Sequence, residues 1–418
     1  MIPKKADVVI IGAGPAGAAM ASLLIQQGIY PLVLERQKFP RFMIGESLLP
    51  EALNCLSQAG LLEVVTNGGH QFKDGARFSC QEKQCDFQFS DKVSQGINYA
   101  YQVKRQHFDH DLINHCIGQG ANTVFETQVT SLKKNERGYQ LQVQYGDEMH
   151  HVDAGFVVDA SGFGRVLARL LKLDKPSSFP PKKAIFSHLS DNISAHLFDR
   201  NKISISQTQP LDSTWYWAIP FSDSTVSVGA VMDLPSNNEG KNNSNSRDGS
   251  LDEKEYFDLI ERNHYLSTLL QGAELIRPVS CLSGYSSSIK KLYGDRFVIL
   301  GNAGEFIDPI FSSGVTIALK SAVMAAPLVT SVIKGEAANW EDDFQLPLIR
   351  GINAFKVYVE SWYSGPLQRL IYSDYRDGNT YRQICSVLAG YVWDESNPLT
   401  AISTQDLERI ARIVSTNG

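Results

Sequence analysis

Cysteine is scarce in this sequence, and the few residues present are dispersed. The 418 residues include six Cys, which are Cys55, Cys80, Cys85, Cys116, Cys281 and Cys385. Because no CxxC pair occurs, a zinc site built on paired cysteines is excluded, and we expect no bound metal. Dispersed cysteines in a chain of this length are typical of reduced packing residues rather than of a disulfide framework.

A strong charge of one sign, a targeting segment and a long apolar run are missing as well. The net charge of −6 gives no general attraction to nucleic acid or to anionic membranes. Met1–Ala6 runs into an apolar strand without the charged and apolar regions of a signal peptide. No uninterrupted apolar stretch is long enough for us to expect a membrane-spanning helix. We therefore expect a cytoplasmic protein with neither a nucleic-acid partner nor a membrane span.

The bulk composition is that of a globular protein, with 43% hydrophobic and 20% charged residues. The length predicts two or three packed regions rather than one small core. Ser236–Ser250 is rich in Asn, Ser, Gly and charge, which predicts a solvated loop.

The chain begins with the pattern of a βαβ unit. An apolar, β-branched run at Asp7–Ile11 predicts a buried parallel strand, and a helix of small residues follows at Ala18–Gln27. Between them Gly12–Gly17 reads GAGPAG and fits GxGxxG, while Tyr30–Leu34 predicts the second strand. In this context the glycine motif predicts a dinucleotide-binding site.

Each glycine of the GxGxxG pattern has a physical role in that site. Gly12 makes the tight turn, Gly14 lets the backbone approach a pyrophosphate, and Gly17 lets the helix pack against the strand. The positive end of the helix faces the phosphates. Glu35, at the end of the second strand, is placed to accept hydrogen bonds from the adenosine ribose.

Two later segments also place a glycine-containing turn at the end of a strand. Val157–Gly162 ends a buried strand with Asp159 and a glycine turn, and Phe297–Gly304 ends another strand before a helix. With the first motif, these segments resemble the flavoprotein monooxygenase superfamily in order and spacing. The segment Gln102–Asp109 also resembles the superfamily segment in which an arginine, here Arg105, helps to hold the flavin.

The resemblance covers nearly the whole chain and implies an FAD cofactor and a fold. The fold class is α/β: a Rossmann-type FAD-binding domain, glutathione-reductase-like as in aromatic hydroxylases, with an inserted, mainly antiparallel β-sheet domain for substrate and a C-terminal helical region. We expect the FAD-binding domain at 1–80, 102–180 and 275–340, the sheet at 81–101 and 181–274, and the helices at 341–418.

Three further segments resemble the signatures of flavin-dependent halogenases. Trp215–Pro220 reads WYWAIP and matches WxWxIP in full. Phe306–Val315 resembles the second signature, beside the flavin ring, and Gly45–Pro50, preceded by Pro40–Phe42, resembles the GES segment. The resemblance implies FAD contacts from Gly12, Gly14, Ala16, Gly17, Glu35, Arg36, Arg41, Glu46, Ser47, Arg105, Asp159, Gly301, Asn302, Pro309, Ser312, Ser313, Gly314 and Val315.

In that family halide attacks the hydroperoxide of the reduced flavin, and hypohalous acid travels to a separate substrate pocket. Trp215 and Trp217 then wall the substrate off from the flavin. Backbone amides around Ser312–Gly314, at a helix N-terminus, are expected to hold chloride or bromide. Because no second GxGxxG occurs, FADH2 is expected to come from a separate flavin reductase.

The family also uses a lysine after the GES segment, and Lys73 aligns with it in Gln71–Phe78. The resemblance implies that Lys73 forms a chloramine or donates a hydrogen bond to hypohalous acid, so we treat Lys73, Trp215 and Trp217 as catalytic candidates. One departure is Asn302, where the superfamily usually has aspartate. Asn keeps a carbonyl acceptor for a ribityl hydroxyl, so we expect FAD still to bind.

The expected substrate is aromatic, a phenol, pyrrole or indole, either free, carrier-bound or part of a partner protein. Halogenase-like flavoproteins that hydroxylate a protein tryptophan during cysteine tryptophylquinone biogenesis share this architecture, and the motifs do not exclude that activity. A non-catalytic flavin-binding partner protein is a further alternative. A reductase of isoprenoid double bonds is the weakest, because it has no use for WxWxIP or Lys73.

Overall fold

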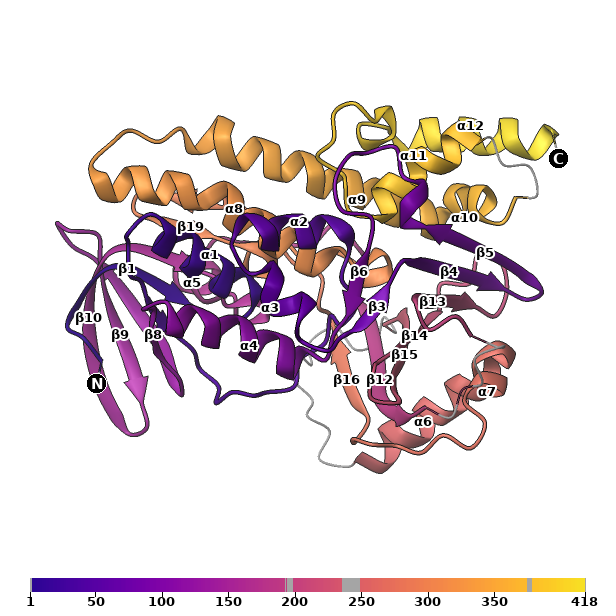
Figure 1. Cartoon of the computed structure of the whole chain (residues 1–418), viewed down its shortest axis with the longest axis horizontal. Helices are drawn as coiled ribbons and strands as arrows, with labels where there is room; N and C mark the ends of the chain where they lie inside the picture. The colour runs from indigo at the N-terminus through magenta and orange to yellow at the C-terminus, as the bar shows by residue number, and fades with distance from the viewer. Residues whose placement is uncertain (1, 192, 194–197, 235–248, 374–377, 418) are drawn as a thin grey trace. The chain divides into compact units, whose positions relative to one another are not determined.

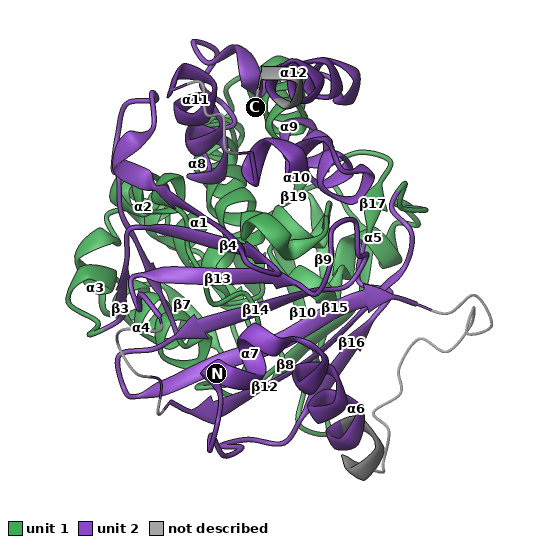
Figure 2. Cartoon of the chain, turned by 90° about the vertical axis from the view of Figure 1, so that its right-hand side faces the viewer, with its two compact units in different colours: residues 1–69, 104–178, 287–352 green, residues 70–103, 179–286, 353–418 purple. Residues whose placement is uncertain are grey.

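The computed structural model describes residues 2–191, 193, 198–234, 249–373 and 378–417. The chain forms two compact units, coloured separately in Figure 2. Unit 1 comprises 1–69, 104–178 and 287–352, and unit 2 comprises 70–103, 179–286 and 353–418. The loop expected at Ser236–Ser250 lies outside the described residues, apart from its last two residues, which begin a helix.

Unit 1 is built on a largely parallel sheet, which confirms the Rossmann-type fold class. The strand order is β18-β19-β10-β1-β2-β7, and the central pairings are parallel. The strands are β1 (Lys5–Ile11), β2 (Leu32–Leu34), β7 (Asn122–Val124), β10 (Glu148–Asp159), β18 (Tyr293–Gly294) and β19 (Phe297–Ile299). The second halves of β1 and β10 are mainly apolar and fully buried, as expected where both faces of a parallel sheet are covered.

The helices of unit 1 pack on this sheet and on one another, and a hairpin extends the sheet. The helices are α1 (Pro15–Gln26), α2 (Pro50–Gln58), α3 (Leu62–Thr66), α4 (Arg105–Gly118), α5 (Val166–Leu170) and α8 (Ser313–Lys334). In Figure 1 the hairpin of β8 (Thr127–Lys134) and β9 (Tyr139–Tyr145) lies beside β10, to which β9 is antiparallel. A short ribbon pairs β11 (Asp174–Lys175) with β17 (Ser288–Ile289).

Unit 2 contains the expected second sheet. Its order is β16-β12-β15-β14-β13-β4-β5, antiparallel except where β13 pairs with β4. The strands are β4 (Gly75–Cys80), β5 (Lys83–Gln88), β12 (Lys182–Ser190), β13 (Lys202–Gln207), β14 (Trp215–Pro220), β15 (Thr225–Asp233) and β16 (Ser280–Ser283), and they lie side by side in Figure 2. A separate two-stranded ribbon joins β3 (Gln71–Lys73) to β6 (Ala100–Gln102).

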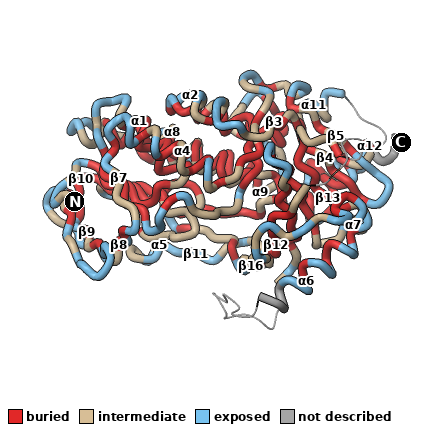
Figure 3. The backbone as a smooth tube through the Cα atoms, turned by 60° about the horizontal axis from the view of Figure 1, so that its bottom comes forward, coloured by how far each residue is buried: buried red, intermediate tan, exposed pale blue. Residues whose placement is uncertain are grey.

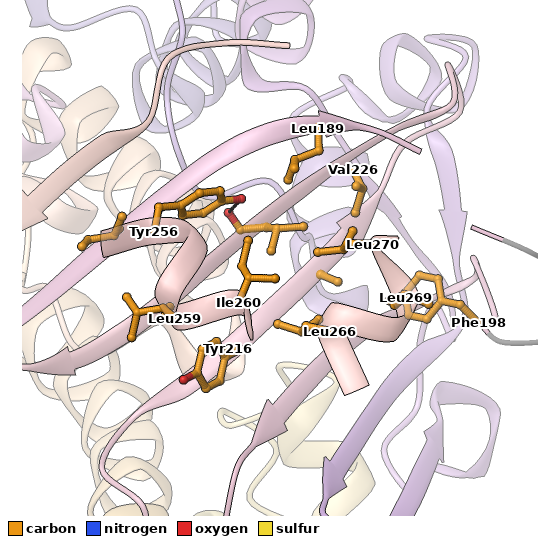
Figure 4. Packing of buried hydrophobic residues seen from close by; sticks show 14 residues of the cluster. Leu189, Phe198, Tyr216, Val226, Tyr256, Leu259, Ile260, Leu266, Leu269 and Leu270 are labelled. Carbon is orange, nitrogen blue, oxygen red and sulfur yellow. Dashed lines mark hydrogen bonds between the residues drawn. The ribbon is translucent and has the colours of Figure 1, made fainter. Parts of the chain in front are cut away.

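One face of this second sheet is covered by α6 (Gly249–Arg262) and α7 (His264–Leu269). Tyr216 and Ala218 of β14 pack with Tyr256 and Ile260 of α6 in a single buried cluster, shown in Figure 4. Figure 3 shows α6 alternating between buried and exposed stretches, as expected of a surface helix. Because side chains alternate along a strand, Trp215 and Trp217 lie on the opposite face of β14.

The remaining helices are C-terminal: α9 (Leu346–Ser364), α10 (Pro366–Ile371), α11 (Gly378–Leu388) and α12 (Thr404–Asn417). The compact units differ from the expected boundaries at three places. Residues 70–80 belong to unit 2 because β4 is a strand of its sheet, and 275–286 belong there because β16 is its edge strand. The C-terminal region does not form one body, since 341–352 belong to unit 1 and the rest to unit 2.

Among the described residues, α8 is the helix that meets a test of length and composition for crossing a membrane, although Lys320 interrupts its apolar run. By length and composition this 22-residue helix passes that test, with a mean hydropathy of 1.7. Over half of its most apolar window is buried inside the structure, and Lys320 in it pairs with Glu51 at 2.8 Å. These are the features of a core helix, packed against α1 and α2.

Candidate functional site

The GxGxxG turn of unit 1 has the shape that its three glycines predict. Gly12 has φ +103°, and a Cβ there would lie 2.6 Å from the Ala160 carbonyl oxygen. A Cβ on Gly17 would lie 1.9 Å from the Gly12 carbonyl oxygen, so the α1 backbone passes directly over the turn. Gly14 differs, because its nearest neighbour would be Arg41 Nη2 at 3.6 Å. Gly14 therefore leaves a surface that another group can approach.

Glu35 ties the end of β2 to this turn. Its carboxylate accepts hydrogen bonds from the Ala13 amide at 2.9 Å and the Gln37 amide at 2.8 Å, and the residue is buried. Each carboxylate oxygen keeps further acceptor capacity for a ribose hydroxyl. Ala16 is buried in the first turn of α1, whereas Arg36 is exposed.

Arg41 and Arg105 meet at one buried carboxylate. The Asp109 carboxylate accepts hydrogen bonds from Arg105 Nε at 2.7 Å and Arg105 Nη2 at 2.9 Å. It also forms an ion pair with Arg41 Nη2 at 2.8 Å. Arg105 Nη1 donates to the carbonyl oxygens of Ile44 and Gly45. Arg105 therefore shapes the chain that enters the GES segment.

The GES segment places two polar side chains in the interior of unit 1. Glu46 is 2% exposed and Ser47 is 5% exposed. The Ser47 hydroxyl is buried and has no hydrogen-bond partner among the described residues. A buried hydroxyl without a partner is costly, which indicates a site for a polar ligand.

The Asp159 side chain is hydrogen-bonded to other groups of the protein. Its carboxylate accepts from the Ser161 amide, the Ser161 hydroxyl and the Leu167 amide, and the residue is fully buried. Burial raises the pKa of Asp159, and the three donors oppose that shift. The structure therefore gives this side chain a bracing role at the strand end, and its contact with FAD stays a prediction.

The β19 end and the start of α8 come together. The Gly301 amide donates to Ser321 Oγ at 3.0 Å, and a Cβ on Gly314 would lie 3.6 Å from Asn302 Oδ1. Ser312 precedes α8 in the left-handed region at φ +55°, and no side chain of the described chain caps this helix. The first amides of α8, from Ser313 onward, are thus available to an anion or a carbonyl.

Two orphaned oxygens lie in this region. Asn302 Oδ1 and Thr316 Oγ1 are buried and lack a hydrogen-bond partner among the described residues. Arg41 Nη1 and Ser47 Oγ are two further buried polar atoms of unit 1 without a partner among the described residues, and Arg41, Ser47 and Asn302 are all predicted to bind FAD. The residues present therefore fit a large polar cofactor such as FAD. Pro309 lies between Asn302 and Thr316 in the chain, in a short turn capped by Asp308.

Lys73 lies in unit 2, at the end of β3. It is 1% exposed, and its Nζ lies 5.2 Å from the centroid of the Phe89 ring. Burial lowers the pKa of Lys73 to about 7, because a charged ammonium loses its hydration there. The adjacent Asp74 pairs with Lys202 at 3.1 Å. Lys73 is therefore an amine that changes charge near neutral pH, not an ordinary solvated lysine.

Trp215 and Trp217 form a buried aromatic layer in unit 2. Their ring centroids are 5.7 Å apart, and the indole N–H groups donate to the Tyr363 hydroxyl at 2.9 Å and the Ser227 hydroxyl at 3.2 Å. A Cβ on Gly229 would lie 2.4 Å from the Trp217 ring, so the glycine makes room for that indole. Because side chains alternate along a strand, the WxW spacing places both rings on one face of β14.

Comparison with known proteins agrees with this geometry. The FAD binding domain family matches residues 5–343. The 1H-pyrrole-2-carbonyl-[peptidyl-carrier protein] chlorinase of Pseudomonas fluorescens is 30% identical over 357 residues, covering 78% of this chain and 76% of that protein. The chain belongs to the flavin-dependent halogenase family. It is accordingly an FAD-dependent enzyme of the halogenase type.

Other similar proteins match this chain over different lengths and at different sequence identities. A flavoprotein/dehydrogenase from Cytophaga hutchinsonii has a TM-score of 0.91 at 37% identity, with 99% of each chain covered. The flavin-dependent brominase Bmp2 has a TM-score of 0.79 at 23% identity, which supports the fold alone. The halogenase-family chain covers only 63% of the flavin-dependent halogenase ascD of Acremonium egyptiacum, to which it is 30% identical.

Sequence reasoning missed two residues of this halogenase-family site. Asp109 was noticed only as the end of the arginine-containing segment, although its i, i+4 spacing from Arg105 on a predicted helix was a usable signal. Thr316 carried no signal, because a threonine in an apolar helix usually packs as a core residue. Its unsatisfied hydroxyl is visible only in the folded chain.

Proposed function

We propose that this enzyme oxidises chloride or bromide with reduced FAD and O2, and that Lys73 directs the resulting hypohalous acid to an electron-rich aromatic substrate. The observation that carries the proposal is the complete burial of Lys73 with a pKa near 7. A buried amine of this kind is costly to the fold, and such groups are enriched at functional sites.

FAD, once reduced, supplies the two electrons that make O2 an oxidant. In unit 1, Arg41 and the GxGxxG turn hold the phosphates, while Ser47 and Asn302 accept or donate at the flavin and ribityl groups. The uncapped amides of Ser313 and Gly314, with the Thr316 hydroxyl, favour an anion and are the proposed halide site.

In unit 2, Lys73 acts as a hydrogen-bond donor. Its ammonium Nζ polarises the oxygen of hypohalous acid and gives that oxygen a proton, so that it leaves as water while the halogen bonds to a ring carbon. The ring carbon then loses its own proton, which restores the ammonium directly or through solvent. The aromatic layer of Trp215 and Trp217 excludes water and bulky groups on its side of the sheet.

The substrate is proposed to be a phenol, a pyrrole or an indole, in free or carrier-bound form. The similarity to a chlorinase named for a carrier-bound pyrrole supports the carrier-bound class. A separate reductase is proposed to supply FADH2.

The Lys73→Met variant tests the proposal, because Met has a similar volume and no charge. With chemically reduced FAD, O2, bromide and a panel of phenol, pyrrole and indole substrates, the ratio of brominated product to FADH2 consumed is measured. We expect the ratio to fall roughly 100-fold or more while FADH2 oxidation stays within about twofold. Lys83→Met, which alters an exposed lysine of β5, is the matched control. Bromination retained by Lys73→Met would remove Lys73 from the mechanism.

A further inference from the structure

Asp109 stands between two arginines in the interior of unit 1. Its side chain is 1% exposed, while those of Arg41 and Arg105 are 10% and 8% exposed. Arg105 takes both carboxylate oxygens in a bidentate pair, and Arg41 Nη2 adds a third hydrogen bond on Oδ2. One carboxylate thus serves two guanidinium groups, which leaves one positive charge uncompensated within the triad.

The donor group of the triad that has no protein partner belongs to Arg41. Arg41 Nη1 is buried and finds no hydrogen-bond partner among the described residues. The other Arg41 amino group is held by Asp109, and the Phe39 ring lies 4.5 Å from Cζ. Asp109 and the Phe39 ring therefore fix the Arg41 side chain, and the Nη1 group has no acceptor among the described residues. A buried guanidinium in this state calls for an anionic ligand.

The triad lies against the GxGxxG turn. A Cβ on Gly14 would be 3.6 Å from Arg41 Nη2 and 3.9 Å from Asp109 Oδ2. Gly14 is also the residue that precedes α1, whose first amides carry partial positive charge. The Arg41 guanidinium and the N-terminus of α1 therefore lie close to the same small volume. Both would attract a pyrophosphate there.

Arg105 has a different task in this arrangement. Both its Nη1 contacts go to the carbonyl oxygens of Ile44 and Gly45, and its Nε and Nη2 go to Asp109. A Cβ on Gly45 would lie 3.0 Å from Arg105 Nη1. Arg105 is thus engaged by the protein itself, whereas Arg41 keeps a donor for ligand.

We propose that Asp109 is a positioning residue for FAD binding: it orients Arg41 toward the pyrophosphate and holds Arg105 on the backbone that leads into the GES segment. Arg105 then contributes to the flavin site through that backbone rather than by direct contact. This inference rests on FAD binding and does not depend on the proposed halogenation, so either can fail alone.

A double-mutant cycle on the apoprotein tests the inference. The dissociation constant of oxidised FAD is measured by flavin fluorescence for the wild type, Arg41→Gln, Asp109→Asn and the double variant. We expect Arg41→Gln to weaken binding roughly 10- to 100-fold and Asp109→Asn roughly 10-fold. In the Arg41→Gln background, Asp109→Asn should cost several-fold less than in the wild type, because only its hold on Arg105 remains to be lost.

Control and fallback variants keep the outcome decisive. Arg137→Gln, which removes an exposed arginine paired with Asp7 at 2.8 Å, should leave FAD affinity unchanged. If Asp109→Asn does not fold, Asp109→Glu retains the charge with a longer side chain, and it should weaken FAD binding more when Arg41 is present than when it is absent. Equal losses from the Asp109 variant in both backgrounds would overturn the proposal, as would an Arg41→Gln variant with wild-type affinity for FAD.

Discussion

Single glycines divide the FAD site into parts that fold the protein and parts that admit the cofactor. At Gly17 a methyl group would meet the Gly12 carbonyl oxygen at 1.9 Å, whereas at Gly14 the nearest neighbour is 3.6 Å away. Gly14→Ala should therefore leave apoprotein stability within about 1 kcal/mol and raise the FAD dissociation constant roughly tenfold or more, since the methyl group obstructs the pyrophosphate.

Gly17→Ala should instead lower the free energy of unfolding by more than about 2 kcal/mol, because backbone must move. Urea unfolding of the apoproteins and flavin titration separate the two effects. Gly118→Ala serves as the control, since a Cβ there meets nothing within 4 Å. Equal destabilisation by the Gly14 and Gly17 variants would contradict this division.

The charge of Lys73 makes a prediction about pH. Burial lowers its pKa to about 7, so the ammonium predominates below pH 7 and the neutral amine above it. If the ammonium donates to hypohalous acid, the brominated product per FADH2 consumed should fall as pH rises through about 7. Oxidation of FADH2 need not follow the same curve. A coupling ratio that is flat from pH 6 to 9, or that rises with pH, argues against the ammonium as donor.

Residue patterns singled out several residues that the structure leaves with unmet hydrogen-bonding capacity, and they overlooked others for physical reasons. Arg41, Ser47 and Asn302 were predicted from motifs, and each carries an unsatisfied buried polar atom in the structure. Asp109 was not singled out, because a carboxylate beside an arginine on a helix most often forms a surface ion pair. Only the approach of Arg41, 68 positions earlier in the chain, distinguishes it, and that approach depends on the fold.

At the scale of single elements, β15 is shaped by the tryptophan it faces. Gly229 pairs with Trp217 across the strands, and a Cβ on Gly229 would lie 2.4 Å from that ring. Gly229→Ala should destabilise the enzyme by about 1 to 3 kcal/mol, because the packed indole has to shift. Urea unfolding followed by tryptophan fluorescence measures the loss.

A smaller ring provides the check on that explanation. Trp217→Phe combined with Gly229→Ala should recover part of the loss in a double-mutant cycle, since the phenyl ring leaves room for the methyl group. Gly378→Ala is the control in unit 2, because a Cβ there has no neighbour within 4 Å. Strict additivity of the two substitutions would mean that the clash with Trp217 is not the cause.

The elements that sequence predicted least well are those whose partners decide their length. The sequence pattern indicates only the buried end of a strand, at Val157–Gly162, whereas β10 runs from Glu148 to Asp159. Its first half is polar and half exposed, and it is a strand because it pairs with β9. In the same way, β4 was assigned to the first domain by position, whereas its pairing with β13 places it in the second sheet.

At the scale of the whole chain, the two functions proposed for the enzyme reside in different compact units. The predicted FAD residues all lie in unit 1, and Lys73, Trp215 and Trp217 all lie in unit 2. The order of motifs predicted both sets, because the resemblance spans nearly the entire sequence. The division of the C-terminal helices between units was not predictable, since it depends on which apolar face each helix finds.

The central claim is that the oxidising equivalent leaves FAD as hypohalous acid. It is tested most directly by mass spectrometry of the aromatic product after wild-type enzyme turns over chemically reduced FAD with ¹⁸O2 and bromide. The account predicts a product that carries bromine and no ¹⁸O, with the label recovered in water. A product that carries ¹⁸O and no bromine would contradict it and would point to hydroxylation, of a small aromatic or of a tryptophan in a partner protein.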